Sequence, residues 1–132
     1  MNYLGRHLIL ELTCCPEALL VDCPRIQSLM EAAARIMGAT IVESRFHHFS
    51  PLGVSGVVII MESHLTVHTW PEYGYAAVDI FTCGDIDLER GTDFLVREFG
   101  AQAVSIKSLD RGALEEKRDS DLPPQVAPES PV

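Results

Sequence analysis

The residue types best placed to do chemistry in this chain are the run Glu62-Ser63-His64, followed further along by His68 and Cys83. A serine hydroxyl can attack the carbonyl carbon of the residue before it, so Ser63 could break the backbone after Glu62. Loss of the serine amino group would then leave a pyruvoyl group at position 63. This ketone forms a Schiff base with an amine and accepts electrons as pyridoxal phosphate does. The pattern favours a chain that cuts itself between Glu62 and Ser63 and makes its own cofactor for decarboxylation.

Self-cleavage and decarboxylation both need assisting groups, and three residues have suitable chemistry. A histidine can remove the alpha proton of residue 63, which assigns His68 to processing. The hydroxyl of Ser55 is a candidate donor to the oxyanion that forms on the attacked carbonyl. The thiol of Cys83 can return a proton to the substrate carbon after carbon dioxide has left. Ser63 itself needs a strained or tightly turned backbone, because its hydroxyl must reach the preceding carbonyl.

The spacing of these residues sets one geometric requirement. Residues 63 and 68 differ by an odd number, so a regular strand would put them on opposite faces. A bulge, or a turn that begins at Ser63, is then needed to bring them together. The same residue types are also common in structural positions, with serine in turns, histidine on strands and cysteine as a small buried residue. The adjacent His47 and His48 would point to opposite faces of a strand, so we expect no metal site.

The elements that must position these residues follow from the spacing of apolar side chains. Asp22-Cys23-Pro24 is typical of a helix start, and Gly38 of a helix end. The predicted order is strand 4–12, helix 22–38, strands 39–49, 54–61, 65–70 and 76–83, helix 87–99, and strand 102–109. Short connections favour an α+β fold, a two-layer α/β sandwich of an antiparallel sheet with two helices on one face. The other face must then meet water, a ligand or a second subunit.

Composition limits the classes of partner. The chain has 132 residues, of which 47% are hydrophobic, enough for one domain. A formal net charge of -9 argues against nucleic-acid binding. The longest apolar run, Val57–Met61, is too short to cross a membrane, and cysteines without a CxxC pair indicate a cytoplasmic setting. We expect one domain over residues 1–112 and a disordered, acidic and proline-rich tail over residues 113–132.

Residues 53–83 read GVSGVVIIMESHLTVHTWPEYGYAAVDIFTC and resemble the signature of the small prokaryotic S-adenosylmethionine decarboxylases. The resemblance extends upstream to Leu4–Leu8, Gly38–Val42 and Phe46–Pro51. It implies a pyruvoyl group made from Ser63, with Glu62 as the new end of the upstream chain. It also implies a two-layer α/β fold and a homodimer of cleaved protomers, with residues of both subunits in each site.

The same resemblance implies roles for individual residues. Ser55 and His68 match the residues that assist processing, and Cys83 matches the proton donor in decarboxylation. Glu72 matches the carboxylate that holds the ribose hydroxyls of the substrate, a task suited to two acceptor oxygens. Phe49 matches an aromatic residue that stacks on adenine, and Trp70 would border the same pocket.

The activity implied is the conversion of S-adenosylmethionine to its decarboxylated aminopropyl donor for spermidine synthesis. Relatives with the same scaffold and self-processing chemistry decarboxylate arginine or ornithine, and Glu72 could equally hold a guanidinium. A more remote alternative is a ligand-binding module that keeps the fold and does not cut itself. The sequence leaves open the subunit number, any activator, the processing rate, and the roles of the tail, Cys14 and Cys15.

Overall fold

The structure, a computed structural model, describes residues 2–49 and 51–114. Its elements are β1 (Asn2–Thr13), α1 (Glu17–Leu20), α2 (Cys23–Ile36), β2 (Thr40–His48), β3 (Val54–Met61), β4 (Ser63–Trp70), the short 3-10 helix η1 (Pro71–Tyr73), β5 (Tyr75–Thr82), α3 (Leu88–Glu98) and β6 (Ala103–Leu114). The strands form a 6-stranded sheet in the order β2-β3-β4-β5-β1-β6. Every neighbouring pair of strands is antiparallel.

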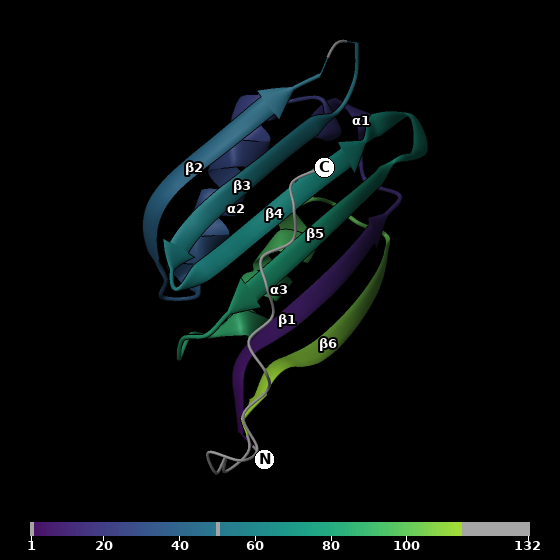
Figure 1. The fold of residues 1–132 in the computed structure, drawn as a ribbon. Coiled ribbons are helices and arrows are strands. Elements are labelled where there is room, and N and C mark those ends of the chain that lie inside the picture. Colours follow the sequence, from purple (N-terminus) through teal and green to yellow (C-terminus); the bar gives the residue numbers. More distant parts are fainter. Residues whose placement is uncertain (1, 50, 115–132) are drawn as a thin grey trace, which may run out of the picture.

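The helices α2 and α3 lie behind one face of this sheet (Figure 1). This arrangement confirms the predicted α+β fold, in which two helices cover one face of an antiparallel sheet. Each predicted strand and each predicted helix forms; β3 has the predicted bounds, and the ends of the other elements differ by up to five residues. The sequence does not predict α1 and η1, because a single helical turn is too short to show a periodic pattern.

Both long helices begin at a capping aspartate. The carboxylate of Asp22 accepts a hydrogen bond from the backbone N–H of Arg25 at 3.1 Å, and Pro24 lies in the first turn of α2. Asp87 caps α3 in the same way, accepting from the N–H of Arg90 at 3.1 Å. These side chains satisfy donors that the first helical turn leaves free. The helices are thereby held at a defined start, from which their apolar residues face the sheet.

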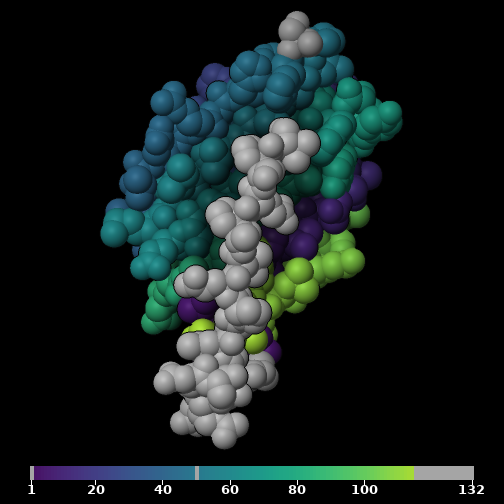
Figure 2. Space-filling view, in the orientation of Figure 1, coloured from purple at the N-terminus to yellow at the C-terminus, as the bar shows by residue number. Residues whose placement is uncertain are grey.

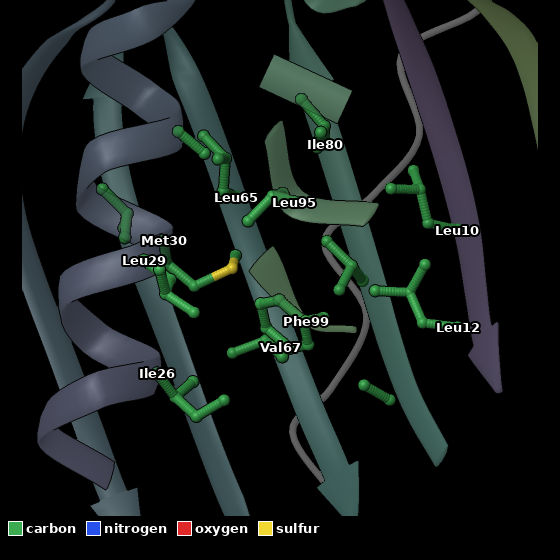
Figure 3. Packing of buried hydrophobic residues seen from close by; sticks show 14 of the residues in the cluster. Leu10, Leu12, Ile26, Leu29, Met30, Leu65, Val67, Ile80, Leu95 and Phe99 are labelled. Atoms are coloured by element: carbon green, nitrogen blue, oxygen red, sulfur yellow. The ribbon is translucent and has the colours of Figure 1, made fainter. Parts of the chain in front are cut away.

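The core fills the space between the helices and the sheet (Figure 3). Met30 of α2 and Leu95 of α3 point toward Leu65 and Val67 of β4 in this view. All four side chains are 0% exposed. Since side chains alternate along a strand, the even-numbered residues of β4 project from the opposite face of the sheet. The core therefore decides which side of β4 is free for chemistry.

The opposite face of the sheet has no helix over it in the described part of the chain, and Figure 2 looks onto this uncovered face. It exposes apolar side chains of β3, with Ile59 40% and Met61 63% exposed. Its middle carries a polar group, in which His7 Nε2 lies 3.0 Å from Asp79 Oδ1. The hydroxyl of Thr66 donates to the other oxygen of Asp79 at 3.2 Å. This is the face that, from the sequence, we expect to contact water, a ligand or a second subunit.

Strand β6 forms one edge of the sheet and continues to Leu114, past the predicted domain end at residue 112. All of its residues are exposed, so neither of its faces is buried. The rest of the predicted tail, residues 115–132, lies outside the described residues. Within the described ranges, none of the helices has the length and apolar character needed to span a membrane.

Candidate active site

Ser63 lies directly after the tight turn that joins β3 to β4. Ile60 and Ser63 are register partners, so Met61 and Glu62 form the turn between them. The φ angle of Ser63 is 119°, which residues with a side chain rarely adopt. The peptide bond after Glu62 therefore lies at a strained hairpin end, as an attack by the serine hydroxyl would require.

Cys83 reaches this turn from the end of β5. Its Sγ atom lies 3.3 Å from the Oγ atom of Ser63. Its backbone N–H donates a hydrogen bond at 3.4 Å to the carbonyl oxygen of Glu62, the carbonyl that Ser63 would attack. This N–H is thus placed to stabilise negative charge on that oxygen. Sequence reasoning does not identify the group, because every residue except proline carries a backbone N–H.

A cavity of about 280 Å³ opens beside Cys83. Its walls come from β1, the end of β5, the loop that follows, the start of α3, and β6, with Tyr3, Arg6 and Asp110 among the lining residues. Cys83 thus lines the cavity and also contacts Ser63 at the turn. We call Ser63, Cys83 and the Glu62 carbonyl the cleavage cluster.

Ser55 and His68 form a second cluster on the neighbouring strands β3 and β4. They are register partners, and Ser55 Oγ lies 2.7 Å from His68 Nδ1. Together with Phe49, Trp70 and Glu72 they line a pocket of about 330 Å³. This pocket cluster therefore brings the predicted processing residues Ser55 and His68 together with all three predicted substrate-binding residues.

Turns at the ends of β2 and β4 place the substrate-binding candidates at this pocket. Gly53 has a φ angle of 95°, which glycine adopts readily, and its carbonyl accepts from the N–H of Phe49 at 2.9 Å. This contact closes the β2–β3 hairpin and fixes the backbone of Phe49. Trp70 is the last residue of β4, and Glu72 follows in η1. The pocket is thus built where two strand ends meet.

The described chain keeps the two clusters apart. Ser63 and His68 lie at opposite parts of β4, five residues apart, a separation of about 16 Å at the rise of a strand. The turn at Ser63 does not return the chain toward His68, because β4 stays paired with β3 from Ser63 to His68. Ser55 is the partner of His68 and is equally distant. Within one protomer, neither side chain reaches the Glu62 carbonyl, so their processing roles stay predictions.

A family model described as S-adenosylmethionine decarboxylase matches residues 6–112, a span that contains both clusters. The chain belongs to the S-adenosylmethionine decarboxylase family. The family predicted from residues 53–83 is confirmed by this match. Membership identifies the chain as an enzyme of this family and counts against the alternative of a non-catalytic binding module.

Members of the S-adenosylmethionine decarboxylase family are similar to this chain over most of its length. The S-adenosylmethionine decarboxylase proenzyme of Carboxydothermus hydrogenoformans is 52% identical over 118 residues, covering 89% of this chain and 93% of the relative. The proenzyme of Thermodesulfovibrio yellowstonii is 44% identical, covering 98% of this chain and 96% of the relative. The chain also resembles the crystal structure of the adenosylmethionine decarboxylase from Aquifex aeolicus, with a TM-score of 0.83. The two sequences are 31% identical, and the match covers 90% of this chain and 99% of that chain.

The names of these decarboxylase relatives describe them as proenzymes, that is, as precursors of an active form. A chain of this family therefore invites the question of which bond is cut and which group becomes active. In the part of the chain that the structure describes, no three His, Cys, Asp or Glu side chains gather as a metal site would require. The strained turn at Ser63 is the candidate position for such a cut.

Proposed function

We propose that this chain is a proenzyme that cuts itself between Glu62 and Ser63 and then decarboxylates S-adenosylmethionine, which yields an aminopropyl donor for spermidine synthesis. The observation that carries the proposal is the cleavage cluster. There the side chain of Ser63 touches the Cys83 thiol, and the carbonyl before it accepts the Cys83 N–H. The names of the relatives favour S-adenosylmethionine over arginine or ornithine as the substrate.

The first step is an attack by Ser63 Oγ on the Glu62 carbonyl carbon, which moves the acyl group from nitrogen to oxygen. The N–H of Cys83 donates to the oxyanion that forms, because it already donates to this carbonyl oxygen in the uncut chain. A base then removes the alpha proton of residue 63, and the Cβ–Oγ bond of that residue breaks by elimination, which releases Glu62 as a carboxylate and leaves dehydroalanine. Water displaces ammonia from the remaining dehydroalanine and leaves pyruvoyl at position 63 of the downstream chain.

The residues around position 63 fit a pyruvoyl group. Such a group supplies a ketone that draws electrons away from the bond to the departing carboxylate when a substrate amine is bound to it. The Cys83 thiol lies within 3.3 Å of the side chain at this position. It is therefore placed to hold the proton that the substrate carbon needs after carbon dioxide leaves.

The pocket cluster fits the other end of an adenosylated substrate. Phe49 and Trp70 offer flat aromatic surfaces, 49% and 41% exposed, to an adenine ring. Glu72, in the same pocket, offers two acceptor oxygens to the vicinal hydroxyls of a ribose. Ornithine has no flat group to stack on these rings, and the planar guanidinium of arginine covers much less aromatic surface than an adenine ring does. The pocket thus favours an adenosine-bearing substrate on chemical grounds.

A homodimer would unite the two clusters. About 16 Å of extended strand separates Ser63 from His68 in one protomer, so the two clusters do not form one compact site in the same chain. We propose that two protomers meet through their uncovered faces, so that the partner's His68 and the partner's Ser55 approach Ser63. The exposed apolar residues Ile59 and Met61 on this face give such an association a driving force. The proposed location is the cytoplasm, in agreement with four free cysteines.

The intact mass of the purified protein under denaturing conditions tests the proposal. Two chains, residues 1–62 and 63–132, are expected, the second lighter by one ammonia than a fragment that begins with serine. The Ser63→Ala variant is expected to stay uncut and inactive, because neither the attack nor the ketone is then possible. A full-length mass that persists on prolonged incubation would contradict self-cleavage.

Carboxyl-labelled substrates test the reaction itself. Carbon dioxide is expected from S-adenosylmethionine and not from arginine or ornithine when each is offered to the processed protein. Release from arginine or ornithine alone would overturn the substrate and leave the self-cleavage intact. The two experiments therefore separate the maturation of the chain from its choice of substrate.

A further inference from the structure

The indole of Trp70 is held by a neighbouring aromatic ring. Trp70 and Tyr75 are register partners on β4 and β5. Their rings are stacked, with centroids 5.3 Å apart and an angle of 28° between the planes. Trp70 also lines the pocket that contains Phe49 and Glu72. One face of the indole therefore rests on Tyr75, and the side chain still presents surface to the pocket.

Tyr75 is fixed in turn from the next strand along the sheet. Its hydroxyl donates a hydrogen bond to the carboxylate of Glu11 on β1. Burial raises the pKa of the Tyr75 phenol to about 12, and the hydrogen bond to Glu11 and the charges of Glu11 and Asp79 act in the same direction. The phenol is therefore protonated at neutral pH and continues to donate. Trp70, Tyr75 and Glu11 form a chain of contacts that crosses β4, β5 and β1.

We propose that Tyr75 is a positioning residue of the substrate pocket, which together with Glu11 holds the indole of Trp70 as a fixed wall for the adenine of the substrate. This inference rests on the proposed function and deepens it, because it names what gives the pocket its affinity for a flat base. An unsupported tryptophan at a strand end would have to be immobilised by each substrate molecule. Immobilising such a side chain costs binding free energy. Tyr75 removes that cost before the substrate arrives.

A cross-strand aromatic pair also stabilises a sheet, so the test must separate binding from folding. The chain offers a direct fluorescent reporter of the pocket, because Trp70 is the single tryptophan in the sequence. All tryptophan fluorescence therefore comes from the proposed wall. Adenosine, which lacks the reacting amino acid, serves as a binding probe that requires no catalysis. Its stacking on the indole is expected to quench the emission.

The Tyr75→Leu variant removes the ring that supports Trp70. We expect the KM for S-adenosylmethionine and the Kd for adenosine to rise together by about three- to tenfold. The kcat is expected to stay within about twofold, because Cys83 and the group at position 63 are untouched. The Tyr75→Phe variant keeps the stacked ring and is expected to restore both constants to within about threefold of the unchanged protein. Tyr73, which is 78% exposed, supplies the matched control Tyr73→Leu, expected to change neither constant.

A measurement on the unchanged protein covers the case in which Tyr75→Leu does not fold. Time-resolved fluorescence anisotropy is expected to show an indole that moves only with the whole protein. A dominant subnanosecond motion of the indole would overturn the proposal, and so would a folded Tyr75→Leu variant with unchanged KM and adenosine Kd. Failure of the proposed function is distinguishable, because it would appear in the unchanged protein as an intact Glu62–Ser63 bond. The anisotropy and the adenosine titration can be measured on that uncut chain as well.

Discussion

Cys83 meets the cleavage turn through two different atoms. Its backbone N–H contacts the carbonyl of Glu62, and its thiol contacts the hydroxyl of Ser63. The first contact belongs to the cutting of the chain, and the second to the proton transfer that follows decarboxylation. A substitution of the side chain leaves the N–H in place, so the two tasks can be separated by a single mutation.

The Cys83→Ala variant is therefore expected to cut itself and to lose decarboxylation. The loss of a positioned proton donor is expected to lower kcat by about 100-fold or more. Intact mass measures the cutting, and release of labelled carbon dioxide measures the turnover. Cys23→Ala, which changes a thiol remote from both clusters in sequence and outside their cavities, is the control. Normal turnover in Cys83→Ala would remove the thiol from the proton-donor role.

The sequence identifies the site residues by type but does not show how they are grouped. Ser63 and Cys83 stand out as reactive types, and Glu72, Phe49 and Trp70 follow from a resemblance. That Ser55 pairs with His68 depends on the register of β3 against β4, which residue types alone do not reveal. That Ser63 lies far from His68 depends on β4 staying extended. A backbone donor such as the Cys83 N–H leaves no trace in a sequence at all.

The hairpin of β2 and β3 is assembled around an aromatic ring that covers a glycine. Gly56 is the register partner of Phe46, and a Cβ atom added to Gly56 would come within 2.0 Å of the Phe46 ring. Only a residue without a side chain fits there unless the ring moves. Ser55 of the pocket cluster precedes Gly56 on the same strand.

The Gly56→Ala variant is accordingly expected to lose stability. Displacing the Phe46 ring is expected to lower the free energy of unfolding by about 1–3 kcal/mol. Urea denaturation measures the change. Gly84→Ala is the stability control, because the nearest atom to an added Cβ lies 3.6 Å away there. Equal stability of the two variants would show that the Phe46 ring yields without strain.

The contact between α2 and β2 is expected to depend on pH. The hydroxyl of Ser44 donates to the carboxylate of Glu31, and Gln27 donates to the same oxygen at 3.0 Å. The bond from Ser44, followed by the bond from Gln27, holds the pKa of Glu31 below its ordinary value of 4.5. Because the folded pKa is lowered, this stabilisation is present above pH 4.5 and is lost as the pH falls through the folded pKa.

The Ser44→Ala variant tests this dependence. At pH 7 it is expected to be less stable than the unchanged protein by about 1 kcal/mol, the contribution of one hydrogen bond. The difference is expected to shrink as the pH falls below the ordinary range of a glutamate. Urea denaturation at a series of pH values measures both curves. A difference that stays constant down to pH 3 would mean that the Glu31 charge has no part in it.

The predictability of each element follows from how it is buried. The helices α2 and α3 each bury one stripe against the sheet, and this produces the spacing that predicts them. Strands β1 and β5 bury every second residue, which produces alternation. Strand β6 is exposed along its whole length, so its last residues carry no burial pattern and extend beyond the predicted end at residue 109. The one-turn α1 has no period to detect.

For the whole molecule, the decisive feature is that a helix-covered sheet carries two incomplete clusters on different parts of β4. If two protomers complete each other's sites, a residue that is missing from a cluster of one protomer can be supplied by the other protomer. This is a property of a symmetric pair, in which the same surfaces meet twice. It can be tested without a structure of the dimer.

Co-expression of Ser63→Ala and His68→Ala chains with different tags provides that test. Neither variant alone is expected to yield a pyruvoyl-ended fragment. In mixed dimers the His68→Ala chain keeps Ser63 and meets an intact histidine from its partner. About half of the His68→Ala chains are expected to mature when equal amounts assort randomly. Mass spectrometry of the separated tags measures this fraction, and its absence would mean that each chain must supply its own histidine.

The order of strands in the sheet has a consequence for the cut protein. Cleavage after Glu62 would assign β1, β2 and β3 to the upstream piece, and β4, β5 and β6 to the downstream piece. In the sheet, however, β1 lies between β5 and β6, so the pieces interlock along the pairs β3–β4, β5–β1 and β1–β6. The mature protein would consist of two polypeptides, made from a single chain, whose strands are interleaved in one sheet. Its melting would become a dissociation, with a midpoint that rises with protein concentration, whereas the uncut Ser63→Ala chain can still refold as one piece.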